Sequence, residues 1–208
     1  MERGTEILVL GIGNLLWADE GFGVRMVEAL HERYIFSEDV RLVDGGTQGL
    51  YLVQYVQSAR KMLVFDALDY QLQPGEVKLV RNDDVPNFLH AKKMSLHQSG
   101  FQEVLATAKL TGKYPEEILL IGVQPLDMED YGGSLTPPVK AQVAHCMDLA
   151  VAALEGWGVK AQARVEALAP HERLNVGGLD LNAYESGRPG AHEACRIGDA
   201  RVVFGKGF

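Results

Sequence analysis

Hydrophobic runs that end at glycine or acidic residues alternate with helical patterns along the first 160 residues of the 208-residue chain. Residues 7–13 form a continuous apolar run ending in glycine, which is typical of a strand buried on both faces. Further strands are predicted at residues 40–43, 61–65, 76–80 and 117–123. Residues 76–80 alternate apolar and polar positions, as a strand with one wet face does, and residues 77–80 are the candidate for an antiparallel exception.

Apolar residues at helical spacing follow four of these strands. The first predicted helix begins near Asp19 or Glu20, and the others span about residues 48–57, 95–107 and 139–154, with Ser95 as an N-cap. Strands that alternate with helices predict an α/β fold. We expect a three-layer sandwich in which helices flank a twisted, mainly parallel, five-stranded sheet.

The hydrophobic pattern of the sequence changes after about residue 160. From there on, glycine, proline and charged residues interrupt every apolar run, and only residues 201–204 resemble a strand. We therefore expect residues 1–159 to form the α/β domain. Residues 160–208 are expected to be an extension of uncertain order that packs on this domain or contacts a partner.

The charge balance and cysteine count exclude several classes of partner. Twenty basic residues against 28 acidic ones give a net charge of −8, which opposes attachment to nucleic acid or anionic lipid. The early apolar run is too short to span a membrane, and Glu2 and Glu6 precede it where a signal peptide carries positive charge. Two cysteines fit a reducing compartment. We expect a cytoplasmic protein that binds neither nucleic acid nor membrane, with a monomer as the simplest state.

Polar residues that directly follow the predicted strands are the candidates for chemistry, because parallel sheets bind ligands beyond the carboxyl ends of their strands. These residues are Asn14, Asp19, Glu20, Asp44, Asp66, Asp69, His97, Gln124 and Asp127. Two carboxylates and an imidazole, from Glu20, Asp66 and His97, suit a borderline divalent ion such as Ni²⁺ or Zn²⁺. Three protein ligands would leave a position open for water or substrate.

Several of these residues also have a structural interpretation. Asp19 could cap the first helix, and Asp44 could bond its own turn. Gly11 and Gly13 begin a dinucleotide-binding fingerprint, but Leu16 stands where the third glycine belongs. The chain has no G-x-S-x-G, H-E-x-x-H or C-x-x-C motif, which leaves serine hydrolase, zincin and thioredoxin functions without support.

Six motifs occur in order along the chain and together resemble a known family. They are Gly11-Ile12-Gly13-Asn14, Asp19-Glu20-Gly21-Phe22-Gly23-Val24-Arg25, Asp44-Gly45-Gly46-Thr47, Phe65-Asp66-Ala67-Leu68-Asp69, Ser95-Leu96-His97-Gln98 and Ile121-Gly122-Val123-Gln124-Pro125. Over about residues 6–155 the chain resembles the NiFe-hydrogenase maturation endopeptidases, the processing proteases of the hydrogenase large subunit.

This resemblance implies a nickel-dependent endopeptidase, of aspartic or metallo type, that removes a short C-terminal peptide from the nickel-loaded large-subunit precursor. The family's metal-contacting residues fall on Glu20, Asp66 and His97, which are then also the expected catalytic residues. Its substrate-recognition segment falls on Asp44, Gly45, Gly46, Thr47 and Gly49. The implied metal is nickel supplied by the substrate, for which zinc or cadmium could substitute in crystals.

Two other functions are compatible with the residues. A chaperone would bind the nickel-loaded subunit without cutting it, and it would form a stable complex with no released peptide. A nucleotide-binding regulator would use Gly11, Gly13 and Asp44, and titration with NAD or FAD would detect it.

Overall fold

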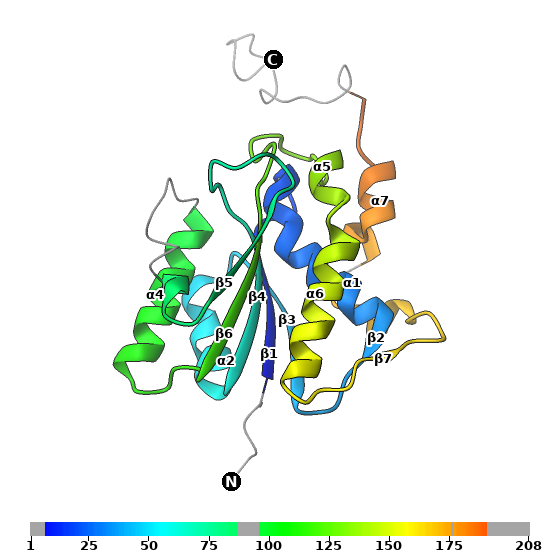
Figure 1. Cartoon of the computed structure of the whole chain (residues 1–208). Helices are drawn as coiled ribbons and strands as arrows, with labels where there is room; N and C mark the ends of the chain where they lie inside the picture. The colour runs from blue at the N-terminus through cyan, green and yellow to red at the C-terminus, as the bar shows by residue number, and fades with distance from the viewer. Residues whose placement is uncertain (1–6, 87–95, 176, 191–208) are drawn as a thin grey trace, which may run out of the picture.

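A five-stranded sheet forms the centre of the computed structural model, which describes residues 7–86, 96–175 and 177–190 (Figure 1). The strand order is β3-β1-β4-β6-β5, and the strands are β1 (Ile7–Ile12), β3 (Val40–Gly46), β4 (Lys61–Ala67), β5 (Val77–Arg81) and β6 (Glu117–Val123). Neighbouring strands are parallel except for β5, which runs antiparallel to β6. The predicted fold class and the predicted antiparallel strand are confirmed.

Helices cover both faces of the sheet (Figure 1). One face packs against α1 (Phe22–Arg33), α5 (Pro137–Lys140) and α6 (Val143–Gly156), and the other packs against α2 (Val53–Ser58) and α4 (Leu96–Leu110). Side chains alternate along each strand. In β1, Val9 belongs to the core under α1 and α6, whereas Leu8 and Leu10 belong to the core under α2 and α4. The central strands are apolar throughout because both of their faces are covered.

Two of the predicted helices differ in form from the expectation. The helix expected over residues 48–57 is a 3₁₀ turn, η2 (Gly49–Leu52), that continues into α2. The helix expected over residues 139–154 is divided into α5 and α6. The division occurs because the Gln142 N–H bonds to the carbonyl of Val139, three residues back instead of four, which tightens the turn.

The first helix begins slightly later than expected, at Phe22, and a 3₁₀ turn, η1 (Ala18–Gly21), precedes it. The predicted N-cap Ser95 and the strand-like residues 201–204 lie outside the described residues. Among the helices of the described ranges, none has the length and apolar character needed to cross a membrane.

The chain after α6 returns to the side of the molecule that α1 occupies, and α7 (Leu181–Ser186) lies beside α1 and α5 (Figure 1). The antiparallel pair β2 (Tyr34–Ile35) and β7 (Gln162–Ala163) ties its start to the end of α1. Two 3₁₀ turns, η3 (Pro170–Glu172) and η4 (Gly177–Leu179), precede α7. We call residues 160–175 and 177–190 the C-terminal segment.

Candidate active site at the carboxyl edge of the sheet

Glu20 is held against the end of β1 by main-chain contacts. The Asn14 N–H donates to the carbonyl of Glu20 at 3.1 Å, and the Glu20 N–H donates to the carbonyl of Trp17 at 2.9 Å. Gly13 has a φ of 138°, and a Cβ there would lie 1.8 Å from the Glu20 carbonyl oxygen. Only glycine fits this position, so the turn that carries Glu20 lies directly on the carboxyl end of the strand.

A second close approach brings α1 onto the ends of β1 and β4. A Cβ on Gly23 would meet the carbonyl oxygens of Ile12 and Phe65 at 2.2 and 2.3 Å, and a Cβ on Gly11 would meet the Gly23 carbonyl oxygen at 2.2 Å. The glycines that resemble a nucleotide fingerprint therefore serve packing between β1 and α1. Because β1 and β4 are neighbours in the sheet, the turn of Glu20 and the strand of Asp66 meet at the same edge.

Asp66 lies in β4 opposite Gly122 of β6, and only 1% of it is exposed. A carboxylate is costly to bury, so a position of this kind favours a nearby cation or several donors. Tyr70 packs its ring over Gly122, where a Cβ would lie 2.4 Å from the tyrosine hydroxyl. The pKa of Tyr70 is raised above its ordinary value, first by burial and then by the negative charge of Asp66. The phenol of Tyr70 therefore stays protonated beside Asp66, a neighbour that the sequence analysis missed.

The predicted recognition turn is built by glycines at the end of β3. Gly46 and Gly49 have φ values of 45° and 53°, in the left-handed region that favours glycine. The Gly13 N–H donates to the Gly46 carbonyl at 3.1 Å, which fixes this turn beside the turn of Glu20. Thr47 at the apex of the turn is exposed.

The carboxyl group of Asp44 is half-buried under this turn. Burial raises the pKa of Asp44, while hydrogen bonds from the Gly46 N–H and the Asn175 amide and the charge of Arg25 act in the opposite direction. The Asp44 carboxylate lies close to its own turn, since a Cβ on Gly46 would lie 3.4 Å from Asp44 Oδ1. Arg25 ends the second of the six motifs, but the sequence analysis gave it no role.

His97 lies in the first turn of α4, and its side chain falls outside the described part of the structure. The backbone of that helix does reach the recognition turn. A Cβ on Gly100, about one helical turn beyond His97, would lie 3.3 Å from the Cα of Gly49. The start of α4 and the turn after β3 are therefore in contact.

Four other polar residues from the strand ends have structural partners. Asp19 is fully buried, and its carboxylate accepts hydrogen bonds from the N–H groups of Leu126, Asp127 and Thr136 and from the Thr136 hydroxyl. Asp19 therefore ties η1 to the loop after β6 and does not cap α1, whose N-cap is Gly21.

The loops after β4 and β6 are joined in a similar way. Asp69 Oδ1 accepts from the Gln71 N–H and from Gln124 Nε2, and Gln124 Oε1 accepts from the Tyr70 N–H at 2.7 Å. Asp127 Oδ1 accepts from the N–H groups of Glu129 and Asp130 and so closes its own turn. These side chains therefore hold the loops at the carboxyl edge of the sheet in place.

No group of three or more His, Cys, Asp or Glu side chains within the described ranges could hold a metal ion. The predicted trio of Glu20, Asp66 and His97 includes a side chain outside those ranges. For this trio the structure gives the backbone frame: the turn after β1 for Glu20, the neighbouring strand β4 for Asp66, and the start of α4 for His97.

A cavity of about 1070 Å³ opens beside η1. One wall comes from Trp17 and from Tyr131 in the loop after β6, whose rings meet edge to face at a centroid distance of 5.2 Å. The other wall comes from the C-terminal segment, with Tyr184 and Arg188. Trp17 lies beside the turn that carries Glu20, because the Glu20 N–H donates to the Trp17 carbonyl.

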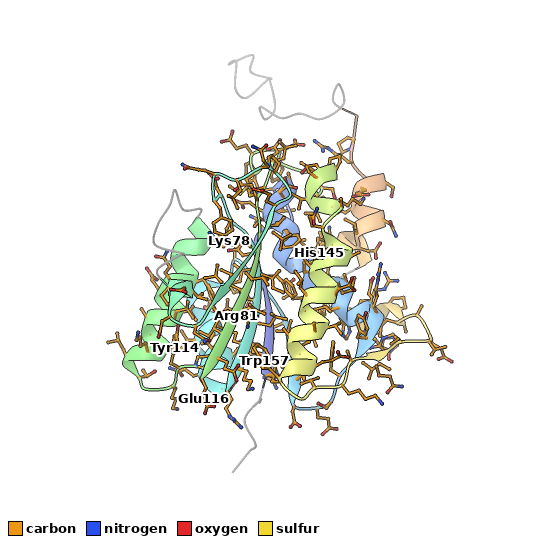
Figure 2. The ribbon with its side chains drawn as sticks, in the orientation of Figure 1. Lys78, Arg81, Tyr114, Glu116, His145 and Trp157 are labelled. Carbon is orange, nitrogen blue, oxygen red and sulfur yellow. The ribbon has the colours of Figure 1, made fainter. Side chains whose placement is uncertain are left out.

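The opposite edge of the sheet looks different. There Trp157 Nε1 donates to Glu117 Oε2 at 3.0 Å, and Lys61 Nζ lies 2.7 Å from Glu117 Oε1 (Figure 2 labels Trp157). The hydrogen bond from Lys61 lowers the pKa of Glu117. These contacts are ordinary surface pairs.

Comparison with known proteins agrees with this geometry. A family model described as hydrogenase maturation protease matches residues 24–153. The chain is 56% identical over 203 residues to the hydrogenase expression/formation protein HupD of Thiocapsa roseopersicina, a match that covers 98% of this chain and 92% of that protein. It is 58% identical over 197 residues to HoxM of Azotobacter vinelandii, covering 95% of this chain and 94% of that protein.

The fold has a solved counterpart. The hydrogenase maturating endopeptidase HybD from Escherichia coli superposes with a TM-score of 0.73 at 38% sequence identity. This match covers 98% of the E. coli chain but only 76% of the present one. About a quarter of the chain therefore has no counterpart in the E. coli protein, whereas HupD matches nearly all of it.

Proposed function

Because the chain belongs to the hydrogenase maturation protease family, we propose that it removes a short C-terminal peptide from the nickel-loaded large-subunit precursor of a NiFe hydrogenase. The family is one of endopeptidases that mature hydrogenases. The observation that carries the finer proposal is the joining of three segments at one sheet edge: the Glu20 turn on β1, Asp66 on β4, and the recognition turn in contact with the start of α4.

Nickel enters this proposal as part of the substrate. Two carboxylates and an imidazole are suitable ligands for a borderline divalent ion, and a cation beside Asp66 would offset the cost of burying its carboxylate. We propose that Glu20, Asp66 and His97 bind the nickel of the precursor and thereby make cutting depend on its presence. A metal bound in this way can polarise the scissile amide or activate water.

The remaining residues position the precursor. The recognition segment of Asp44, Gly45, Gly46, Thr47 and Gly49 presents an exposed threonine and two left-handed glycines. We propose that this turn contacts the precursor beside the nickel-binding residues. We further propose that the protein acts as a monomer in the cytoplasm, which its two cysteines and its net charge of −8 favour.

The test is cleavage of a purified nickel-loaded precursor by the variants Glu20→Ala, Asp66→Ala and His97→Ala. Each is expected to lower the rate of peptide release by about a hundredfold or more, because each removes a ligand of the reacting centre. The control is Glu129→Gln, which changes an exposed acid outside the trio and is expected to cut at the normal rate.

Undiminished cleavage by all three variants would refute the assignment of the trio. A stable complex of the unmodified protein with the precursor, with no released peptide, would instead identify a chaperone. Metal content of the purified complex, compared with that of the precursor alone, shows whether the nickel stays with the substrate.

A further inference from the structure

Exposed apolar side chains gather where the turn after β1 meets the loop after β6. Trp17 is 36% exposed and Tyr131 is 63% exposed. Leu16 and Leu126, which belong to the same two segments, are exposed as well. The Gly132 N–H donates to the Leu16 carbonyl at 2.8 Å, so the two segments lie side by side. Exposed apolar side chains grouped in this way mark a surface that a ligand or partner covers.

The cavity of about 1070 Å³ beside η1 separates these aromatic rings from the C-terminal segment. Sites for a single small molecule have volumes of about 300–1000 Å³, so this cavity has room for several residues of a peptide. Tyr184 of α7 adds a third aromatic ring to its wall. Tryptophan and tyrosine are among the side chains that contribute most to binding at protein interfaces.

The guanidinium in the cavity wall already has a partner within the protein. Arg188 Nη2 lies 2.8 Å from Asp130 Oδ1 and 2.7 Å from Asp130 Oδ2. This ion pair joins the C-terminal segment to the loop after β6. Because Arg188 is paired, the cavity is poorly suited to an anion. Its three rings suit an aromatic or branched aliphatic side chain instead.

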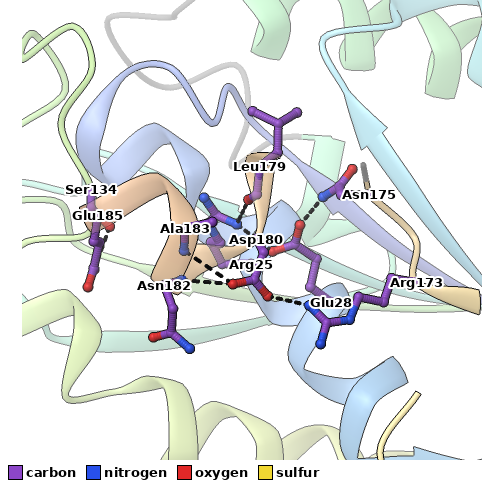
Figure 3. Close-up of polar contacts among 10 residues, drawn as sticks. All are labelled: Arg25, Glu28, Ser134, Arg173, Asn175, Leu179, Asp180, Asn182, Ala183 and Glu185. Carbon is purple, nitrogen blue, oxygen red and sulfur yellow. Dashed lines mark hydrogen bonds and ion pairs between the residues drawn. The ribbon is translucent and has the colours of Figure 1, made fainter. Parts of the chain in front are cut away.

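The wall that the C-terminal segment provides is fastened to the α/β core by side chains outside the cavity. Arg25 Nη1 of α1 donates to the Leu179 carbonyl at 2.5 Å, just before α7 (Figure 3). Within α7, Glu185 Oε1 accepts from the Ser134 hydroxyl at 2.8 Å (Figure 3). The cavity is therefore built into the fold of this chain.

The cavity and the recognition turn lie on opposite sides of the turn that carries Glu20. The recognition turn contacts the start of α4, which covers one face of the sheet, whereas α7 lies with α1 and α5 on the other face (Figure 1). The Gly13 N–H bonds the Glu20 turn to Gly46, and the Glu20 N–H bonds it to Trp17. A precursor held by its nickel at this turn can therefore reach the recognition turn with one part and the cavity with another.

We propose that this cavity binds the C-terminal peptide that the precursor loses, through an apolar or aromatic side chain placed among Trp17, Tyr131 and Tyr184. This inference rests on the proposed function, because it takes the precursor as the substrate and its nickel as the part bound at the sheet edge. The C-terminal segment lies beyond residues 24–153, which the family model matches. Its wall of the cavity is thus an addition to the part of the chain that the family model describes.

The first test uses the two tryptophans of the chain as separate reporters. Trp17 lies in the cavity wall, and Trp157 lies at the opposite edge of the sheet (Figure 2). Incorporation of fluorotryptophan gives one fluorine NMR signal for each, which Trp17→Phe and Trp157→Phe assign. A synthetic peptide with the sequence removed from the precursor is expected to shift the Trp17 signal and to leave the Trp157 signal in place.

The second test measures the cleavage kinetics of Tyr131→Ala, which removes one ring from the cavity and no group proposed to react. We expect KM for the nickel-loaded precursor to rise about tenfold while kcat changes less than about twofold, because the peptide is held equally before and during cutting. Tyr131→Phe keeps the ring and should restore KM. Val165→Ala changes an exposed apolar residue of the C-terminal segment outside the cavity and is expected to keep both constants.

The peptide titration separates this inference from the proposed function, because it needs neither nickel nor cutting. If the protein cuts the precursor but millimolar peptide leaves the Trp17 signal unchanged, the inference is wrong and the proposed function stands. If no cutting occurs but the peptide shifts the Trp17 signal and binds about tenfold more weakly to Tyr131→Ala, the peptide site is supported and the endopeptidase activity fails.

Three other results would also overturn the inference. A Trp17 signal that shifts with protein concentration alone would assign the cavity to a second copy of the chain. A mature large subunit, which lacks the peptide, that shifts this signal as far as the precursor does would assign the cavity to another part of the substrate. An unchanged KM for Tyr131→Ala would show that the ring makes no contact with the precursor.

Discussion

The carboxyl edge of the sheet and the C-terminal segment are held in place by different kinds of contact. At the sheet edge, main chain meets main chain: Gly23 packs on the carbonyl groups of Ile12 and Phe65 with no space for a side chain. The C-terminal segment is held by polar side chains, such as Lys140 to Glu185 and Arg188 to Asp130. The edge therefore tolerates almost no change, whereas the segment can vary one contact at a time.

The two regions therefore differ in how rigidly they are held. The residues proposed to bind nickel lie on the rigid region, where small displacements are excluded by close packing. The C-terminal segment contacts α1 through Asn175, whose Nδ2 donates to Glu28 Oε1.

The largest expected effect is that of Gly23→Ala, which breaks the main-chain contact. A methyl group there would lie 2.2 and 2.3 Å from two carbonyl oxygens that belong to β1 and β4, so α1 must move away from the sheet. We expect the free energy of unfolding in urea to fall by about 4 kcal/mol or more, together with loss of cleavage.

The matched control is Gly156→Ala in α6. A Cβ at Gly156 would meet nothing within 4 Å, and the position is helical. Alanine there should leave stability unchanged or raise it by up to about 1 kcal/mol, because it favours the helix. Equal urea midpoints for the two variants would show that the close approach of α1 is not a strict requirement.

The second-largest loss of stability is expected from Asp19→Asn, which changes a fully buried carboxylate that accepts four hydrogen bonds. An amide group can accept on only one side, so its NH₂ must face a donor of the loop after β6. We expect a loss of about 2–3 kcal/mol in unfolding free energy. Asp127→Asn is the control, because a single oxygen of Asp127 accepts both of its hydrogen bonds and an amide oxygen can replace it at a cost below about 1 kcal/mol.

The sheet and most helices could be predicted because buried strands and amphipathic helices leave a periodic signal in the sequence. The placement of Glu20, Asp44 and Asp66 at strand ends follows from the same signal, since parallel strands bring their carboxyl ends to one edge. The break between α5 and α6 depends on a single hydrogen bond of Gln142, which leaves the hydrophobic pattern unchanged.

Contacts between distant side chains left no such signal. Arg25 and Leu179 are 154 positions apart, and a buried arginine within a helical pattern looks like a surface residue in sequence. Asn175 lies in a stretch without periodicity. Tyr70 follows a strand end but is aromatic, so it looks like a core residue. Partners of this kind become visible only when the fold places them together.

The third prediction concerns pH and the boundary between the two regions. Burial raises the pKa of Glu28 and Asp44 above their unfolded values. Between the unfolded and folded pKa values the folded protein binds more protons, so these groups make the unfolding free energy fall as the pH rises through that range. One such proton gives a slope of at most about 1.4 kcal/mol per pH unit.

The measurement is the unfolding free energy in urea between about pH 4 and pH 7, for the unmodified protein, Glu28→Gln and Asp44→Asn. Each variant should gain stability relative to the unmodified protein as the pH rises, because it lacks the buried ionisation. A difference that stays constant with pH would contradict the buried state of that carboxyl group.

The smallest effect is expected from Glu185→Gln, which breaks the ion pair with Lys140. Both side chains are about a third exposed or more, so the pair contributes at most about 0.5 kcal/mol to global stability. Its local effect should be larger than its global one. Amide hydrogen exchange at Tyr184 of α7 and at its C-cap Gly187 should become a few times faster, and high salt should speed exchange in the unmodified protein in the same way. A global loss as large as that of Asp19→Asn would mean that the C-terminal segment unfolds together with the sheet, and that the two regions do not differ in how they are held.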